Sequence, residues 1–178
     1  MLCDEATCAK KIGTEWERPI RVCFVCTGNT CRSPMAEAVA NAMAKERLRA
    51  IPESMRDCAE PPIEATSAGL FACEGEPIAR HAVTALEEAG ILPIDGRDYH
   101  AHTARSLDEA LANACDLLVG MTGTHVMELM MRYPQLAGRI VCMPSPIPDP
   151  FGGDEDCYRA CLLEIRKGVE QLLFKEDA

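Results

Sequence analysis

Residues 26–34 read Cys-Thr-Gly-Asn-Thr-Cys-Arg-Ser-Pro and lie between an apolar segment and an alanine-rich one. A cysteine, a few small or polar residues and an arginine can curl into a loop whose backbone N–H groups face one tetrahedral oxyanion. Gly28 and Asn29 tolerate the positive φ that such a loop requires. Short motifs also arise by chance in a chain with 11 cysteines. The context adds specificity, because Ser33 and Pro34 are favoured where a helix begins and predict a dipole facing the anion.

The residue types in this loop suit nucleophilic displacement at phosphorus. Cys26 would lie among backbone amides, near a helix N-terminus and near the charge of Arg32, three influences that favour a thiolate nucleophile. Arg32 offers a planar fork of donors that matches two phosphoryl oxygens. Ser33 can donate a hydrogen bond to the sulfur, or it serves only as a helix cap. The residues expected to surround the bound phosphate are Thr27, Gly28, Asn29, Thr30, Cys31 and Ser33.

A proton donor for the leaving group is expected far downstream, where the chain reads Pro148-Asp149-Pro150-Phe151-Gly152-Gly153. Asp149 lies between two prolines, in a segment too rigid for a helix and too poor in N–H donors for a central strand. A carboxyl group on such a stiff loop could protonate the leaving atom and then activate water against a phosphocysteine. Alone, the Asp-Pro pair would be ordinary turn punctuation. Beside the oxyanion loop, it predicts a general acid and base.

With these residues, the chain resembles the low-molecular-weight protein tyrosine phosphatase family, from about Arg21 to the C-terminus. The resemblance implies that Cys26 is the nucleophile, Arg32 the phosphate clamp and Asp149 the general acid and base. It also implies that two further side chains support the loop. Ser67 in the segment Ser-Ala-Gly and His102 ahead of the third strand match family residues that bond the loop asparagine and hold it in a left-handed conformation.

Within the family, the sequence most resembles the bacterial protein arginine phosphatase branch. Members that act on phosphotyrosine usually carry an aliphatic residue at the position of Thr30 and two aromatic residues after the Asp-Pro pair, where this chain has Phe151 and then glycine. A guanidinium would lose hydrogen bonds against a methyl-rich wall, whereas the Thr30 hydroxyl and the Asp149 carboxylate can accept them. We therefore expect phosphoarginine to be preferred. Phosphotyrosine is the alternative substrate, because one added hydroxyl often discriminates weakly.

Other functions are disfavoured. A non-enzymatic phosphate-binding module would need neither a nucleophile nor a proton donor, and it would survive the loss of the thiol. Arsenate reductases of similar fold use further redox cysteines downstream, and residues 86–114 contain none. Cys23, Cys26 and Cys31 invite a metal or iron–sulfur interpretation, but strand alternation places the first two on opposite faces. We therefore expect a hydrolase that needs no cofactor or metal, with a phosphorylated protein as substrate and inorganic phosphate as product.

Composition limits the setting of this chemistry. The 178 residues carry a net charge of −10 and are 48% hydrophobic, which suits one domain and disfavours nucleic acid and anionic membranes as partners. The N-terminal residues 1–18 are predicted to be an extension and residues 19–178 the phosphatase domain. Reduced cysteines and the absence of a signal-like apolar run favour a cytoplasmic protein. Cys31 could form a reversible disulfide with oxidised Cys26, or simply pack.

The elements predicted around the motifs alternate between strand and helix. We expect strands at 21–26, 63–67, 117–121 and 139–143, and helices at 33–48, 78–89, 107–114, 124–133 and 154–174. This alternation predicts a single-domain three-layer α/β sandwich with a four-stranded parallel sheet and helices on both faces. Ligands then bind beyond the carboxyl ends of the strands, where Cys26 lies. Surface or capping roles are expected for His81, His100 and His125, and packing roles for Met127, Met130 and Met131.

Overall fold

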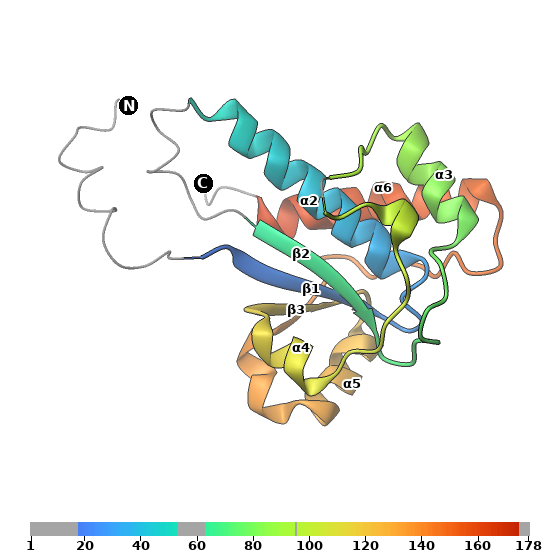
Figure 1. The fold of residues 1–178 in the computed structure, drawn as a ribbon. Helices are drawn as coiled ribbons and strands as arrows, with labels where there is room; N and C mark the ends of the chain where they lie inside the picture. Colours follow the sequence, from blue (N-terminus) through green and yellow to red (C-terminus); the bar gives the residue numbers. More distant parts are fainter. Residues whose placement is uncertain (1–17, 53–62, 95, 175–178) are drawn as a thin grey trace.

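The computed structural model describes residues 18–52, 63–94 and 96–174 (Figure 1). The predicted extension at 1–18 lies outside them except for Arg18, and it stays a prediction. In chain order, with η for 3-10 helices, the elements are β1 (Ile20–Cys26), α2 (Arg32–Ala50), β2 (Ile63–Gly69), α3 (Arg80–Glu88), η2 (Tyr99–Ala101), α4 (Glu109–Ala114), β3 (Leu117–Gly120), α5 (Gly123–Arg132), η3 (Pro134–Arg139), β4 (Ile140–Cys142) and α6 (Glu155–Leu173).

The four described strands form one parallel sheet in the order β2-β1-β3-β4. Cys26, the last residue of β1, pairs in register with Gly69, the last residue of β2. Val25 pairs with Gly120 at the end of β3. The carboxyl ends of the central strands therefore meet at one edge of the sheet, and the loop that follows Cys26 starts there.

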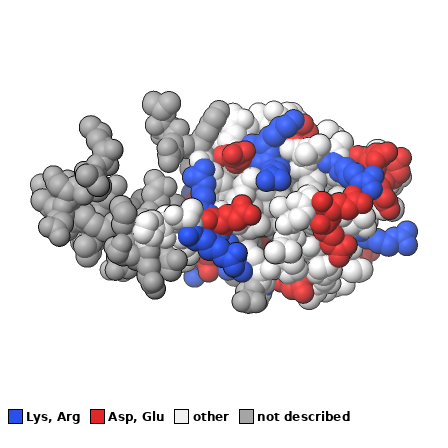
Figure 2. Space-filling view, turned by 90° about the horizontal axis from the view of Figure 1, so that it is seen from above, with Lys and Arg blue, Asp and Glu red and all other residues white. Residues whose placement is uncertain are grey.

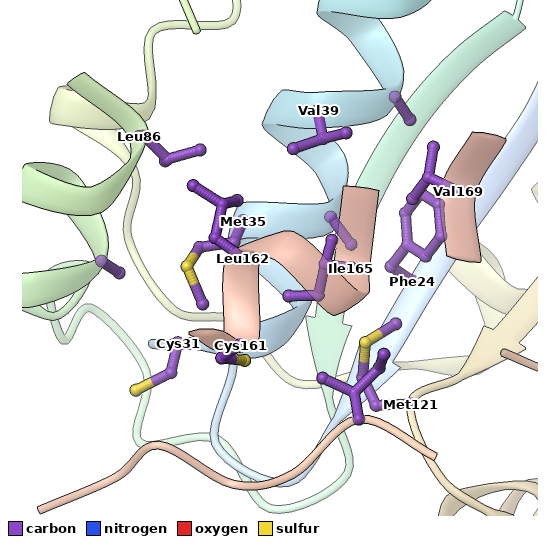
Figure 3. Close-up of a cluster of buried hydrophobic side chains, with 14 of the residues drawn as sticks. Phe24, Cys31, Met35, Val39, Leu86, Met121, Cys161, Leu162, Ile165 and Val169 are labelled. Atoms are coloured by element: carbon purple, nitrogen blue, oxygen red, sulfur yellow. The ribbon is translucent and has the colours of Figure 1, made fainter. Parts of the chain in front are cut away.

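Helices cover both faces of the sheet, as Figure 1 shows, and the alternation along β1 explains how. Val22 and Phe24 point to one face, where they join the buried side chains of α2, α3 and α6. Cys23 and Val25 point to the other, where they pack with residues of α4 and α5. Figure 3 shows part of the larger core, in which α2 and α6 interdigitate over β1. The predicted three-layer fold is confirmed.

Three expectations about the elements differ from the structure. The last strand is shorter than predicted, because residues 134–139 form η3 and leave only Ile140–Cys142 for β4. Helix α2 begins at Arg32 without a side-chain cap, so Ser33 is not its N-cap. The packing role expected for Met127, Met130 and Met131 is wrong, because these side chains are 66%, 42% and 76% exposed. The inner face of α5 is formed instead by its buried residues.

The distribution of charge on the surface and the character of the helices bear on the expected partners. In Figure 2, Lys and Arg side chains lie among Asp and Glu side chains and form no continuous basic stripe on that face. Of the helices that the structure describes, none is both long and apolar enough to cross a membrane.

Candidate active site

The loop between β1 and α2 is held from outside by its carbonyl groups. Leu70 and Phe71, which follow β2, donate their N–H groups to the carbonyl oxygens of Cys26 and Thr27, each at 2.9 Å. In a planar trans peptide, the C=O of one residue and the N–H of the next point in opposite directions. The N–H groups of Thr27 and Gly28 therefore point away from β2 and toward the space that the loop encloses.

The second half of the loop follows the same rule. His102 contacts the carbonyl oxygen of Asn29 through Nε2 at 2.9 Å, and Ala79 donates its N–H to the carbonyl oxygen of Thr30 at 2.8 Å. The N–H groups of Thr30 and Cys31 consequently turn inward. Together with the N-terminus of α2, these amides form a concave ring of donors at the carboxyl edge of the sheet. Such a ring is suited to a tetrahedral oxyanion.

The sulfur of Cys26 lies at the base of this ring. The residue is 3% exposed, and its Sγ accepts a hydrogen bond from the N–H of Asn29 at 3.2 Å. The hydroxyl of Ser33 lies 3.0 Å from the same sulfur. This hydroxyl also lies 3.4 Å from the carbonyl oxygen of Ala68. The contacts with Asn29 and Ser33 fix the position of the sulfur within the loop.

Asn29 organises the loop from its centre. It has a φ of 59° and is the only non-glycine residue with positive φ in the described chain. Its Nδ2 donates to the hydroxyls of Ser33 at 3.0 Å and Ser67 at 2.9 Å, and its Oδ1 accepts from the backbone N–H of Arg105 at 3.0 Å. With His102 on its carbonyl, Asn29 is thus bonded on all sides. The structure brings Ser67 and His102, the two residues expected to support the loop, into contact with Asn29.

Glu37 and Arg105 also support Asn29 and its partner Ser67, although the sequence analysis did not predict either residue here. Ser67 donates its hydroxyl to Oε2 of Glu37 on α2 at 2.6 Å, and burial raises the pKa of that carboxyl against the opposing effect of this hydrogen bond. Arg105 donates Nε to the carbonyl oxygen of Ser67 at 2.9 Å and also contacts the Thr66 hydroxyl. Neither residue belongs to a local motif, so no signal in the sequence marked it.

Arg32 and Asp149 meet beside the loop although 117 positions separate them. The guanidinium Nη2 donates to Oδ2 of Asp149 at 2.7 Å, and Nη1 donates to the carbonyl oxygen of Ile147 at 3.5 Å. The Arg32 side chain is 6% exposed, whereas that of Asp149 is 51% exposed. The Nε of Arg32 is buried and has no hydrogen-bond partner within the described chain. A buried unpaired donor is costly, so an arriving oxyanion would be stabilised here.

Thr30 and Phe151 are the residues expected to face the leaving group, and they lie in the loop and next to Asp149, respectively. Thr30 is half-buried, and its hydroxyl lies 3.6 Å from the sulfur of Cys31. The same oxygen would lie 3.8 Å from a Cβ on Gly28, so the Thr30 hydroxyl lies beside Gly28 in the loop. Phe151 is 78% exposed, and its N–H donates to Oδ1 of Asp149 at 3.2 Å.

Cys31 is a free thiol in the structure, as is Cys26. Its sulfur lies 3.2 Å from the hydroxyl of Tyr158 on α6. Burial raises the pKa of the Cys31 thiol, against the opposing effect of the Tyr158 hydroxyl. In this state Cys31 packs between the loop and α6.

His125 was expected to be a surface or capping residue, and this is wrong. It is 6% exposed, and its Nε2 lies 3.1 Å from the hydroxyl of Thr27, the residue after Cys26. Its Nδ1 lies 2.7 Å from the hydroxyl of Thr122. A histidine in the first turn of α5 therefore reaches the oxyanion loop. The other two histidines contact surface carboxylates, His81 at Glu155 and His100 at Glu87 and Asp98.

No group of three or more His, Cys, Asp or Glu side chains in residues 18–52, 63–94 and 96–174 is arranged to hold a metal ion. Cys23 lies in the core on the opposite side of the sheet from Cys26. These two cysteines consequently cannot ligate one ion with Cys31.

The fold and the loop define a class of protein, and comparison with known proteins names it. Residues 21–177 match the model of the low molecular weight phosphotyrosine protein phosphatase family. The chain belongs to this family and is a cysteine-dependent protein phosphatase that acts on phosphorylated protein.

Two relatives illustrate the range of the family. The chain is 32% identical to a protein-arginine-phosphatase of Geobacillus stearothermophilus, over 88% of this chain and 96% of the relative. It is also 32% identical to the low molecular weight protein-tyrosine-phosphatase PtpB of Staphylococcus haemolyticus, over 87% of this chain and 94% of the relative.

Solved structures agree with the fold. The low molecular weight protein tyrosine phosphatase of T. tengcongensis superimposes with a TM-score of 0.73 at 34% identity, over 86% of this chain and 97% of its own. A mutant of the YwlE arginine phosphatase with a phosphorylated active-site serine has a TM-score of 0.70 at 28% identity, over 86% of this chain and 93% of its own.

Proposed function

We propose that the enzyme hydrolyses phosphoarginine in proteins through a cysteinyl-phosphate intermediate. The observation that carries this mechanism is the ring of inward amides over Cys26, closed by the buried and unpaired Nε of Arg32. The bound phosphoryl group would present its phosphorus to the Cys26 sulfur from the side opposite the leaving nitrogen. The amides and Arg32 would then stabilise the equatorial oxygens during an in-line displacement.

The first step forms a bond between the Cys26 sulfur and phosphorus and breaks the bond between phosphorus and nitrogen. The electron pair of the broken bond stays on the guanidine nitrogen, and Asp149 supplies its proton. In the second step, water attacks phosphorus, Asp149 takes a proton from that water, and the sulfur leaves as a thiolate. Inorganic phosphate is released. The Ser33 hydroxyl at 3.0 Å would stabilise the departing sulfur.

The contact between Arg32 and Asp149 is consistent with these roles. Their 2.7 Å ion pair holds the carboxylate at the rim before substrate arrives. A phosphoryl dianion would compete for the guanidinium, and the released Asp149 carboxylate would take up a proton from solvent before it faces the leaving nitrogen. The 51% exposure of the Asp149 side chain leaves room for that movement.

Two hydrogen-bond acceptors near the loop, Thr30 and Asp149, support the preference for phosphoarginine. Relatives of equal identity carry both substrate names, so their names do not decide between the substrates. The Thr30 hydroxyl lies in the loop beside Gly28, and it would accept a hydrogen bond from a guanidinium N–H of the substrate. Asp149 offers a second acceptor. A phenyl ring would gain nothing from either group.

The test compares hydrolysis of phosphoarginine and phosphotyrosine peptides by the wild type, Thr30→Ile and the matched control Thr30→Ser. Losing an acceptor for a buried N–H costs roughly a factor of 10, so Thr30→Ile should lower the ratio of kcat/KM for phosphoarginine over phosphotyrosine by about that factor. Thr30→Ser should leave the ratio within about twofold of wild type. An unchanged ratio in Thr30→Ile would remove Thr30 from the specificity argument, and an active Cys26→Ser variant would refute the intermediate.

We also propose that the enzyme works in the cytoplasm. The eight cysteines that the structure describes are all free thiols, and two of them lie in the oxyanion loop. A reducing compartment would keep such thiols available.

A further inference from the structure

Thr27 is bonded to its surroundings at three points. Its two flanking peptide groups accept hydrogen bonds from Leu70 and Phe71 through the carbonyls of Cys26 and Thr27. The third point is its side chain, whose hydroxyl lies 3.1 Å from Nε2 of His125. Thr27 is itself exposed, so water competes for each of these bonds, whereas His125 is buried. The imidazole is therefore the more rigid partner.

His125 lies in the first turn of α5, at the same edge of the sheet as Cys26. Its second ring nitrogen, Nδ1, lies 2.7 Å from the Thr122 hydroxyl, which in turn lies 2.7 Å from the hydroxyl of Thr124. This chain of hydroxyls fixes the plane of the ring. Burial lowers the pKa of His125, and the nearby positive charge of Arg32 lowers it further, against the opposing charge of Asp149. The ring is thus a neutral partner of Thr27 at neutral pH.

We propose that His125 is a positioning residue of the phosphatase: by holding the Thr27 hydroxyl, it fixes the two peptide groups whose N–H groups meet the phosphoryl oxygens nearest the nucleophile. This inference rests on the proposed role of Cys26. The N–H of Thr27 and the N–H of Gly28 belong to the peptide planes on either side of the Thr27 Cα, so a rotation there redirects both donors. Donors that are aimed before the reaction contribute most to stabilising the transition state.

A purely structural role for His125 is the competing explanation. In that case the contact with Thr122 would matter, because it ties the first turn of α5 to the end of β3. The two ring nitrogens separate the explanations. A glutamine places its terminal amide near the position of Nε2, so it keeps a partner for Thr27, whereas an asparagine places its amide near Nδ1 and keeps a partner for Thr122.

The experiment measures kcat and KM for a phosphopeptide and the affinity for orthovanadate by calorimetry. The variants are His125→Gln, His125→Asn, Thr27→Val and the double variant that combines His125→Asn with Thr27→Val. We expect His125→Asn and Thr27→Val each to lower kcat and vanadate affinity about 10-fold with little change in KM. His125→Gln should stay within about threefold of wild type. The double variant should be no worse than either single variant, because both remove the same hydrogen bond.

Three results would overturn the inference: full activity in His125→Asn with impaired His125→Gln, losses that multiply in the double variant, or unchanged vanadate affinity in all variants. Thermal unfolding of each variant verifies that it is folded. The proposed function fails separately, through a Cys26→Ser variant that hydrolyses the peptide or a wild type that does not. The vanadate measurement still decides the role of His125 in those cases, because it needs no turnover.

Discussion

At the scale of single residues, Asn29 fixes the shape of the loop through both its backbone and its side chain. Its backbone has the positive φ that turns the loop back toward Cys26, and its N–H donates to the sulfur. Its amide joins Ser33, Ser67 and the backbone of Arg105, which come from three parts of the chain. A left-handed conformation in a non-glycine residue costs free energy, and these bonds offset that cost.

Two substitutions at Asn29 separate conformation from hydrogen bonding. Asn29→Gly keeps the conformation accessible but leaves the buried hydroxyls and the Arg105 N–H with fewer partners, so we expect it to lower the free energy of unfolding by about 2 kcal/mol. Asn29→Ala removes the same bonds and adds the strain of positive φ, about 1 kcal/mol more. Urea unfolding with unchanged m-values measures both. Equal losses in the two variants would mean that φ at this position carries no cost.

At the scale of elements, the corner between β3 and α5 decides how close the helix comes to the loop. A Cβ on Gly120 would lie 2.8 Å from Cγ2 and 3.0 Å from the backbone N of Val126, and 3.2 Å from Cβ of His125. The φ of Gly120 lies outside the left-handed region, so the glycine is required by space alone. It allows the first turn of α5 to pack against the end of the strand, and His125 then reaches Thr27.

This packing gives a prediction with a matched control in the same corner. Gly120→Ala should push the first turn of α5 outward, destabilise the fold by about 2 kcal/mol through overpacking and lower kcat by weakening the contact between His125 and Thr27. Gly123→Ala adds the same methyl group at the start of α5, where nothing lies within 4 Å, and should be neutral or slightly stabilising. Chemical unfolding and kcat of both variants are the measurements. Equal effects of the two substitutions would contradict the crowding argument.

Features that depend on a local sequence pattern could be predicted, whereas features that depend on contacts between distant elements could not. The strand, the positive-φ residue Asn29 and the helix start all lie within residues 20–34, so the loop could be predicted, although Gly28 does not adopt the positive φ that it would tolerate. The family resemblance supplied Ser67 and His102. The roles of His125, Glu37 and Arg105 depend on partners from distant elements, to which no spacing points. The exposed methionines of α5 show the same limit, because a ten-residue helix buries only one narrow stripe.

At the scale of the whole molecule, the proposed active site and an ion pair between strand starts lie at opposite ends of the parallel strands. The carboxyl edge carries the loop, Asp149 and His125, while the amino edge is joined by an ion pair. Arg18, which precedes β1, donates Nη1 and Nη2 to the two carboxylate oxygens of Asp116, at 2.7 and 2.6 Å. Asp116 precedes β3 and also accepts from the N–H of Arg21 at 2.9 Å. This carboxylate therefore joins the starts of the two central strands, far from the chemistry.

The pH dependence of stability should report this second edge. The hydrogen bonds from Arg18 hold the pKa of Asp116 at about 2, below its ordinary value of 3.8. A carboxyl whose pKa is lower in the folded state than in the unfolded chain stabilises the fold at any pH above its unfolded pKa. That contribution is lost as the pH falls from about 4 toward 2. Asp116→Asn should therefore lower Tm at pH 7 by about 2 °C, a modest shift because the Arg18 side chain is 53% exposed and solvent screens the pair.

The difference in Tm between the wild type and Asp116→Asn should depend on pH. Because the wild type loses the ionic contribution near pH 2 and Asp116→Asn never has it, the two Tm values should converge as the pH falls. Glu76→Gln removes one charge at an exposed side chain that forms no ion pair among the described residues, and it is the control for net charge alone. Calorimetric melts across this pH range make the measurement. A gap that persists undiminished at pH 2 would show that the Asp116 carboxylate stabilises the strand starts through its geometry, independently of its charge.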